Sequence, residues 1–361
     1  MPIHFSEERW NKVRKNYTQW WDGTLKRPLM KMTVRNAYQP SRPEPKAPLL
    51  CQAVCDQFQY SPEELIDRWD YELEQYEFLG DAFPFINFDF FGPGVLAAFC
   101  GAKLDNSSGG VWFFPTEKKD ISQIHIHYDP ENIWARRIKD LYRAGNQRWQ
   151  GQVLMGMTDL GGILDVIASF RESENLLLDL YDAPEEVLRL CRETQQAWMD
   201  AYNDLNSVLQ PVNPGYSDWS GIYSKDPSYV IQSDFSYMIG TEMFDEFALP
   251  FLKESCDTLT NTIYHLDGQG ELKHLDHLLE IPSLNAVQWV WGDGSPTGKH
   301  WVDVYQKIAA SGKGIHLIGG DQEDFDTVLS QVKGRFYMYT EAKDCDQGKQ
   351  ILDKYGIPLY G

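Results

Sequence analysis

The stretch TIYHLDGQGELKHLDHLLEIPSLNAVQWV, residues 262–290, decides the fold because it contains a complete strand–helix–strand unit. Residues 262–266 and 286–290 are short runs rich in β-branched and aromatic side chains, which is typical of buried strands. Residues 271–279 between them have the apolar spacing of a helix. Two strands joined by a helical crossover run parallel in one sheet, so this stretch predicts a parallel α/β architecture.

The same pattern extends outward in both directions along the chain. Amphipathic helical stretches, such as residues 182–209 and 241–260, alternate with six further runs that predict strands, at residues 29–33, 84–88, 152–157, 216–220, 314–318 and 336–340. Eight strands alternating with helices predict a (β/α)8 (TIM) barrel, with residues 1–361 as a single domain. A doubly wound open sheet is the alternative. It is disfavoured because no glycine-rich phosphate loop follows the first strand.

Two stretches interrupt this alternation. The proline-rich residues 39–61 predict an irregular excursion after the first strand. Ser61, Pro62 and Glu64 then form the signature of a helix start, in which Ser61 and Glu64 make a capping box. Residues 111–128 alternate between apolar and polar side chains, which predicts a hairpin inserted after the second strand.

Composition and charge exclude several classes of function. The formal net charge of −20 repels nucleic acid and anionic membranes. No apolar run reaches the roughly 18 residues of a membrane-spanning helix, and the charged N-terminus lacks the apolar core of a signal peptide. The six cysteines are scattered, which predicts reduced thiols. We therefore expect a cytoplasmic protein that binds a small molecule, with neither nucleic acid nor membrane as a partner.

The barrel prediction locates the candidate site, because active sites of (β/α)8 barrels lie at the carboxyl ends of the strands. A small-molecule site needs an apolar wall with a few convergent polar groups. The predicted strand ends offer both kinds of side chain: Asp89, Asp234 and His265 for catalysis, and Asn87, Trp219, Gln288, Trp289 and Trp291 for substrate binding. Core packing is the alternative role for the tryptophans, and capping of turns or helices is the alternative for Asp89 and Asp234.

His265 and Asp267 are the main metal-binding candidates. They lie two residues apart at a strand end, and a turn at Gly268 would direct both side chains toward one ligand. Imidazole and carboxylate are zinc ligands, and an open zinc site needs about three protein ligands. Glu341, at the end of the last strand, is the predicted third. The alternative is that His265 caps a turn and Asp267 accepts backbone N–H bonds before the next helix.

Five passages taken together resemble a known superfamily. They are residues 27–32 (RPLMKM), 81–102 (DAFPFINFDFFGPGVLAAFCGA), 176–190 (LLLDLYDAPEEVLRL), 244–254 (FDEFALPFLKE) and 265–268 (HLDG). Their order and spacing are similar to those of the uroporphyrinogen decarboxylase and cobamide-dependent methyltransferase superfamily. The resemblance implies a uroporphyrinogen decarboxylase-like barrel, and it also implies a homodimer as one option, since members are often dimers.

The chain departs from the decarboxylases of this superfamily at positions that hold substrate. Their first strand carries a Pro-x-x-x-Met-Arg-Gln-Ala-Gly-Arg-Tyr-x-Pro segment. In the corresponding run Thr33 and Ala37 replace the two arginines that bind substrate carboxylates. The strand-eight histidine motif is replaced by residues 340–342, Thr-Glu-Ala. We therefore do not expect this chain to decarboxylate uroporphyrinogen.

The methyltransferase branch implies a different chemistry. Its members bind zinc through a His-x-Cys pair on strand five and a cysteine on strand eight. Here His265, Asp267 and Glu341 take those places. The resemblance implies a methyltransferase-like enzyme in which zinc acts as a Lewis acid on a small methylated substrate. The DxHxxG signature of corrinoid binding is missing, so a separate corrinoid protein would carry the methyl group.

Two alternatives remain open at this stage. One is a metal-free, decarboxylase-like enzyme on a small acid, with Asp89, Asp234 and His265 as acid and base groups. The other is a non-catalytic barrel that only binds a ligand.

Overall fold

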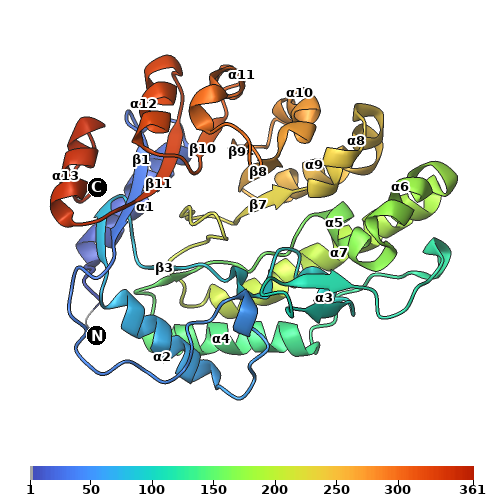
Figure 1. Ribbon diagram of the computed structural model, residues 1–361, viewed down its shortest axis with the longest axis horizontal. Helices are drawn as coiled ribbons and strands as arrows, with labels where there is room; N and C mark the ends of the chain where they lie inside the picture. Colours follow the sequence, from blue (N-terminus) through green and yellow to red (C-terminus); the bar gives the residue numbers. More distant parts are fainter. Residues whose placement is uncertain (1–2) are drawn as a thin grey trace.

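The computed structural model describes residues 3–361 and shows strands surrounded by helices (Figure 1). Eight strands alternate with helices along the chain, which is the order predicted from the sequence. They are β1 Leu29–Val34, β3 Phe85–Ile86, β6 Leu154–Met155, β7 Ser228–Gln232, β8 Asn261–Asp267, β9 Ala286–Val290, β10 Gly314–Leu317 and β11 Phe336–Ala342.

Six of these strands form one continuous parallel ladder in the order β7-β8-β9-β10-β11-β1. An additional strand, β2 Glu77–Gly80, joins the β1 edge in the antiparallel sense. Strands β3 and β6 form a separate parallel pair. Most residues of these strands are buried, as parallel strands covered on both faces require. The chain therefore has an α/β fold with a parallel sheet.

The hydrogen bonds of the described strands do not form one closed ring. On one side of the β3–β6 pair, the Asp81 N–H donates to the Met30 carbonyl of β1 (2.8 Å), and the Met30 N–H donates to the Asp81 carboxylate (3.0 Å). On the other side, the Met157 N–H donates to the carbonyl of Ser217 (2.8 Å), and the Asp218 carboxylate accepts an N–H from β7 (2.8 Å). Loop and side-chain contacts therefore connect the pair to the larger sheet.

The prediction of a strand at residues 216–220 is wrong. This segment makes one isolated bridge, between Tyr216 and Ser224, and the fourth strand of the series is β7 instead. The Asp218 carboxylate accepts the N–H of Ser220 (2.9 Å), and Gly221 adopts a φ of +68°. An aspartate turn followed by a left-handed glycine ends an extended run, so the aromatic residues here form a loop.

Helices lie around the strands (Figure 1). They are α1 Glu7–Trp21, α2 Pro62–Leu73, α3 Leu96–Phe99, α4 Ile133–Trp149, α5 Ile163–Arg171, α6 Ser173–Asp182, α7 Pro184–Leu209, α8 Thr241–Phe247, α9 Leu249–Thr258, α10 Leu275–Leu279, α11 Val302–Ala310, α12 Gln322–Gln331 and α13 Cys345–Lys354. The capping box of Ser61 and Glu64 is confirmed at the start of α2. The helix predicted over residues 241–260 is divided into α8 and α9, because Pro250 suits a first helical turn and not a helix interior.

The two insertions are present, with one change of boundary. Residues 39–61 are irregular apart from the 3-10 turn η1 Gln52–Val54. The hairpin consists of β4 Lys103–Asp105 and β5 Trp112–Phe114. It therefore begins before the predicted residues 111–128, because its turn lies at residues 106–111 and its first strand precedes that turn.

Helix α1, which the sequence patterns did not predict, packs at the end where the strands begin. The Trp10 indole N–H donates to the Gln152 carbonyl just before β6 (3.1 Å), and Trp20 lies against Gly314 at the start of β10. Buried side chains from Ile3 to Ile357 form one hydrophobic cluster. None of the helices within residues 3–361 is long and apolar enough to cross a membrane.

Candidate functional site

Three of the predicted site residues meet where β7 and β8 end. Asp234 begins the 3-10 helix η4 Asp234–Met238 just after β7, and His265 and Asp267 are the last inward residues of β8. Ligand-type atoms of the three side chains lie within 4.8 Å of one another. Gly268, with a φ of +78°, allows the chain to turn directly after Asp267. We call these three residues the acidic cluster.

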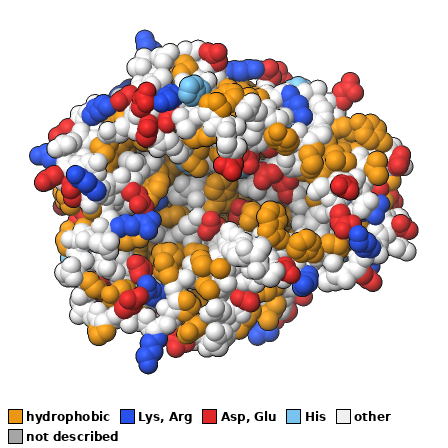
Figure 2. Space-filling model, viewed as in Figure 1, with side chains coloured by type: hydrophobic (Ala, Val, Ile, Leu, Met, Phe, Trp, Pro, Cys, Tyr) orange, Lys and Arg blue, Asp and Glu red, His pale blue; other side chains and the backbone are white. Residues whose placement is uncertain are grey.

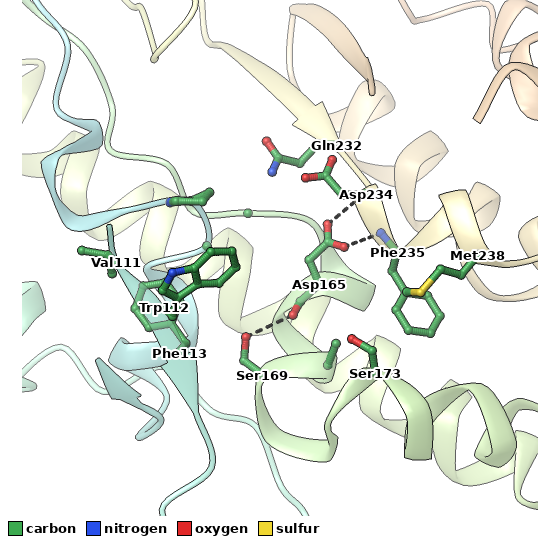
Figure 3. Close-up of a pocket in the computed structure, with 14 residues that line it drawn as sticks. Val111, Trp112, Phe113, Asp165, Ser169, Ser173, Gln232, Asp234, Phe235 and Met238 are labelled. Carbon is green, nitrogen blue, oxygen red and sulfur yellow. Dashed lines mark hydrogen bonds between the residues drawn. The ribbon is translucent and has the colours of Figure 1, made fainter. Parts of the chain in front are cut away.

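Asp165 of α5 holds the backbone beneath this cluster. Its carboxylate accepts the N–H groups of Asp234 (3.1 Å) and Phe235 (2.7 Å), as Figure 3 shows. Burial, followed by the charge of Asp234, raises the pKa of Asp165. Solvent reaches Asp234, yet the surrounding protein removes much of its hydration. That desolvation, together with the charge of Asp267, raises the pKa of Asp234.

A glutamine determines which nitrogen of His265 carries the proton. Gln288 Oε1 lies 2.5 Å from His265 Nδ1, and Gln288 Nε2 lies 2.8 Å from His316 Nδ1. Burial lowers the pKa of both imidazoles, for His316 to about 3, so both are neutral. An amide oxygen only accepts and an amide nitrogen only donates. His265 therefore carries its proton on Nδ1, which leaves Nε2 free to accept or to bind a cation.

Further carboxyl groups surround the acidic cluster. Burial and the nearby charge of Asp234 raise the pKa of Glu271 to about 10, and the hydroxyl of Tyr264 donates to Glu271 (3.0 Å). Burial, opposed in part by a hydrogen bond from Gly161, raises the pKa of Asp159 to about 8. Burial also raises the pKa of Asp89, which lies farther out and whose charge acts on Asp159. Acidic side chains gather around the hollow on the face drawn in Figure 2. This end of the sheet favours a cation or protonated carboxyl groups.

Glu341, the predicted third metal ligand, does not join the acidic cluster. Its carboxylate accepts hydrogen bonds from Arg35 (2.7 and 3.0 Å) and from the hydroxyl of Tyr339 (2.8 Å). Strand β11 lies three ladder positions from β8, which is roughly 14 Å at about 4.8 Å per strand. Asp234, predicted as a catalytic group, is instead the third residue beside His265 and Asp267.

A cavity of about 400 Å³ lies among the strands on the other side of Gln288. Three of the predicted substrate-binding residues, Asn87, Trp219 and Gln288, line this central cavity. The Trp219 ring meets the His265 ring edge-on, with centroids 5.0 Å apart. Trp219 therefore separates the central cavity from the acidic cluster.

Trp289 and Trp291 do not line the central cavity. Successive side chains of a strand point to opposite faces, so Gln288 points inward and Trp289 outward. Trp289 is fully buried against Trp301, with ring centroids 5.3 Å apart. Trp291 follows the strand and lies beside Gly298 and Gly319. Neither tryptophan lines the central cavity, and their predicted role in substrate binding stays a prediction.

A second cavity, of about 360 Å³, opens on the opposite side of the acidic cluster (Figure 3). Asp165 and Asp234 line it between Trp112 of the inserted hairpin and Met238 of η4. The acidic cluster therefore lies between two cavities, because Asp234 lines this one and Gln288, the partner of His265, lines the central one.

Sequence reasoning missed Lys31, the most unusual residue of the central cavity. It is 6% exposed, and its ammonium group donates to the Gly221 carbonyl (3.2 Å) without an ion pair to any described residue. The ammonium nitrogen lies 4.0 Å from the ring centre of Phe85 and 4.8 Å from that of Phe83. Burial lowers the pKa of Lys31 to about 7. A lysine within the otherwise apolar run LMKM was the available signal.

No family model matches the chain, and no curated protein matches it in sequence. Its backbone is similar to solved structures, among them a methyltransferase from Methanosarcina mazei. That similarity has a TM-score of 0.59 and covers 96% of this chain and 95% of the other. The sequence identity is 11%, so the two proteins share a fold, and activity has to be argued from the site.

Proposed function

We propose that this protein is a methyltransferase-like enzyme that binds a divalent cation, with zinc the first candidate, through Asp234, His265 and Asp267. The observation that carries the proposal is the convergence of one imidazole and two carboxylates within 4.8 Å. Three protein ligands and an open position are the usual arrangement of a catalytic zinc site. The shared fold with a methyltransferase supports the same class of reaction.

The surroundings of the acidic cluster fit a cation in two further respects. Ligating histidines almost always donate their other N–H to a fixed acceptor, and Gln288 is that acceptor for His265. Burial and then the charge of Asp234 raise the pKa of Asp165. A bound cation would offset the repulsion between these carboxylates and lower their pKa values, so that the carboxyl groups would be charged.

A bound cation would supply Lewis acidity toward an oxygen atom of the substrate. The other tasks fall to the chain itself. Gln288 keeps the proton of His265 on Nδ1, and Asp165 fixes the backbone at Asp234. The edge-on ring of Trp219 restricts the imidazole and closes the site toward the central cavity.

The proposal includes a partner and a family. The methyl group would pass to or from a corrinoid on a separate protein, because the chain lacks a corrinoid-binding signature. We assign the chain to the uroporphyrinogen decarboxylase-like barrels on two supports, the sequence passages and the series of eight strands. A homodimer is proposed on the sequence resemblance alone.

One observation favours a second candidate, metal-free acid–base chemistry on a small acid. With pKa values of about 8 and about 10, Asp159 and Glu271 are protonated at neutral pH, and both lie near enough to Asp234 for its charge to add to the effect of burial. Uroporphyrinogen is disfavoured as the substrate because Thr33 stands in the central cavity where decarboxylases carry an arginine, and Arg35 is engaged by Glu341.

Metal analysis tests the first candidate against the second. The full chain is incubated with zinc, freed of unbound metal and analysed by mass spectrometry, together with His265→Ala, Asp267→Asn and a Glu341→Gln control. We expect about one zinc per chain in the wild type and in Glu341→Gln, and little in the other two variants. Absence of zinc from the wild type, or equal zinc in all four proteins, would remove the metal proposal and favour acid–base chemistry.

A further inference from the structure

The central cavity offers hydrogen-bond donors that have no acceptor. The Lys31 ammonium group makes one hydrogen bond, to the Gly221 carbonyl, and otherwise faces aromatic rings. The indole N–H of Trp219 is buried without a partner. Nδ1 of His316 accepts a hydrogen bond from the Gln288 amide, so the imidazole proton is on Nε2. The described residues offer no acceptor for that N–H group. Unmet buried donors are costly, and a ligand that accepts hydrogen bonds would satisfy them.

The charges around this cavity also favour an anion. Glu72 is a carboxylate among the described lining residues, and it is paired with Arg68 (2.7 Å). Arg35 lines the cavity as well, and its partner Glu341 is not among the lining residues. Lys31 therefore stands without a counter-ion in a wall to which aromatic side chains contribute almost half of the residues.

The lining sets the shape of a suitable ligand. Rings of Phe83, Phe85, Trp219, Tyr337 and Tyr339 line the cavity, and its volume of about 400 Å³ is that of a small-molecule site. Aromatic walls favour flat, apolar molecules. A suitable ligand therefore combines an anionic group, which would bind Lys31, with a flat apolar body, which would contact the aromatic rings.

We propose that the central cavity binds a flat carboxylic acid of the size of a substituted benzoate, with its carboxylate at Lys31 and its ring against Phe83, Phe85 and Trp219. The binding claim stands on the cavity alone. The Gln288 amide fills the interval between His265 and His316, so the ligand would lie on the Lys31 side of that amide.

Binding of benzoate and 4-methoxybenzoate to the full chain, measured by calorimetry and by tryptophan fluorescence, tests this site. Benzamide and benzylamine serve as the neutral and cationic analogues. We expect benzoate to bind at least about tenfold more tightly than benzamide, and benzylamine not to bind, because a charge-assisted hydrogen bond adds roughly that factor. Equal binding of benzoate and benzamide, or no binding of either acid, would overturn the proposal.

Two matched substitutions locate the carboxylate. Lys31→Met is expected to weaken benzoate binding at least about tenfold and to leave benzamide unchanged. Lys118→Met, at an 81% exposed lysine, should change neither. Trp219→Phe keeps an aromatic side chain, with a smaller ring, and removes the N–H, and a loss of a few-fold is expected. Unchanged benzoate binding by a folded Lys31→Met variant would refute the assignment.

Repeating the titrations with and without zinc separates this site from the proposed metal centre. Benzoate binding that depends on Lys31 in protein without zinc supports the cavity even if no metal is ever bound. Zinc binding without any benzoate binding would leave the proposed function in place and overturn the carboxylate site.

Discussion

The two sides of His265 differ in charge although strands of one parallel ladder build both. On one side Asp234 and Asp267 accumulate negative charge around the imidazole. On the other side Lys31 has a single acceptor, the Gly221 carbonyl, and the indole N–H of Trp219 has none. The net charge of −20 would not suggest a donor-rich interior, because most of the acidic side chains are not buried. Local burial, more than total charge, decides what each cavity can bind.

Lys31→Met should give the largest change in stability, and it should stabilise the protein. Folding takes an ammonium group with a pKa near 10.4 when unfolded to a site where its pKa is about 7. Removing that cost should raise the free energy of unfolding by roughly 2–4 kcal/mol near pH 7. Denaturant unfolding of both proteins provides the measurement.

The pH dependence of this gain has a definite sign. Between pH 7 and about pH 10.4 the unfolded wild type binds more protons than the folded one, so wild-type stability rises with pH. The advantage of Lys31→Met is therefore complete below about pH 7 and shrinks as the pH rises toward 10. A gain that does not vary with pH would mean that Lys31 is not buried as a cation.

Gln288→Leu should break the link between the two sides. It leaves Nδ1 of His265 and Nδ1 of His316 without partners and frees the tautomer of His265. Loss of a group that orients a metal ligand typically lowers metal affinity 10–100-fold, and we expect a zinc affinity reduced by about that factor. Zinc titration against a chromophoric chelator measures it, and zinc affinity equal to that of the wild type would count against His265 as a ligand.

Glu341→Gln should have the smallest effect. The pair of Glu341 with Arg35 is solvent-exposed on both partners, at 41% and 59% of the side chains, and exposed pairs contribute about 0–1 kcal/mol. We expect a melting temperature within a few degrees of the wild type and an unchanged zinc content. A loss of zinc in this variant would restore the three-ligand set predicted from the sequence alone.

Local patterns predicted most of the elements but failed where turn chemistry overrides a strand pattern. Residues 216–220 are aromatic and alternate, yet the Asp218 turn and Gly221 produce a loop. That loop supplies Trp219 and the Gly221 carbonyl to the central cavity, so the failed strand prediction falls within the candidate site. Helix α1 was missed because its function, covering the end where the strands begin, depends on contacts such as Trp20 with Gly314.

The sequence by itself determined the α/β class, the strand order and the convergence of His265 with Asp267, because these follow from periodicity and from spacing within one strand. Only the tertiary structure decided that Asp234 and not Glu341 completes the cluster, since ladder position separates β11 from β8. It also decided that Gln288 joins two imidazoles and that Lys31 is buried without a counter-ion. Both depend on which neighbours surround a side chain, and residues distant in sequence supply them.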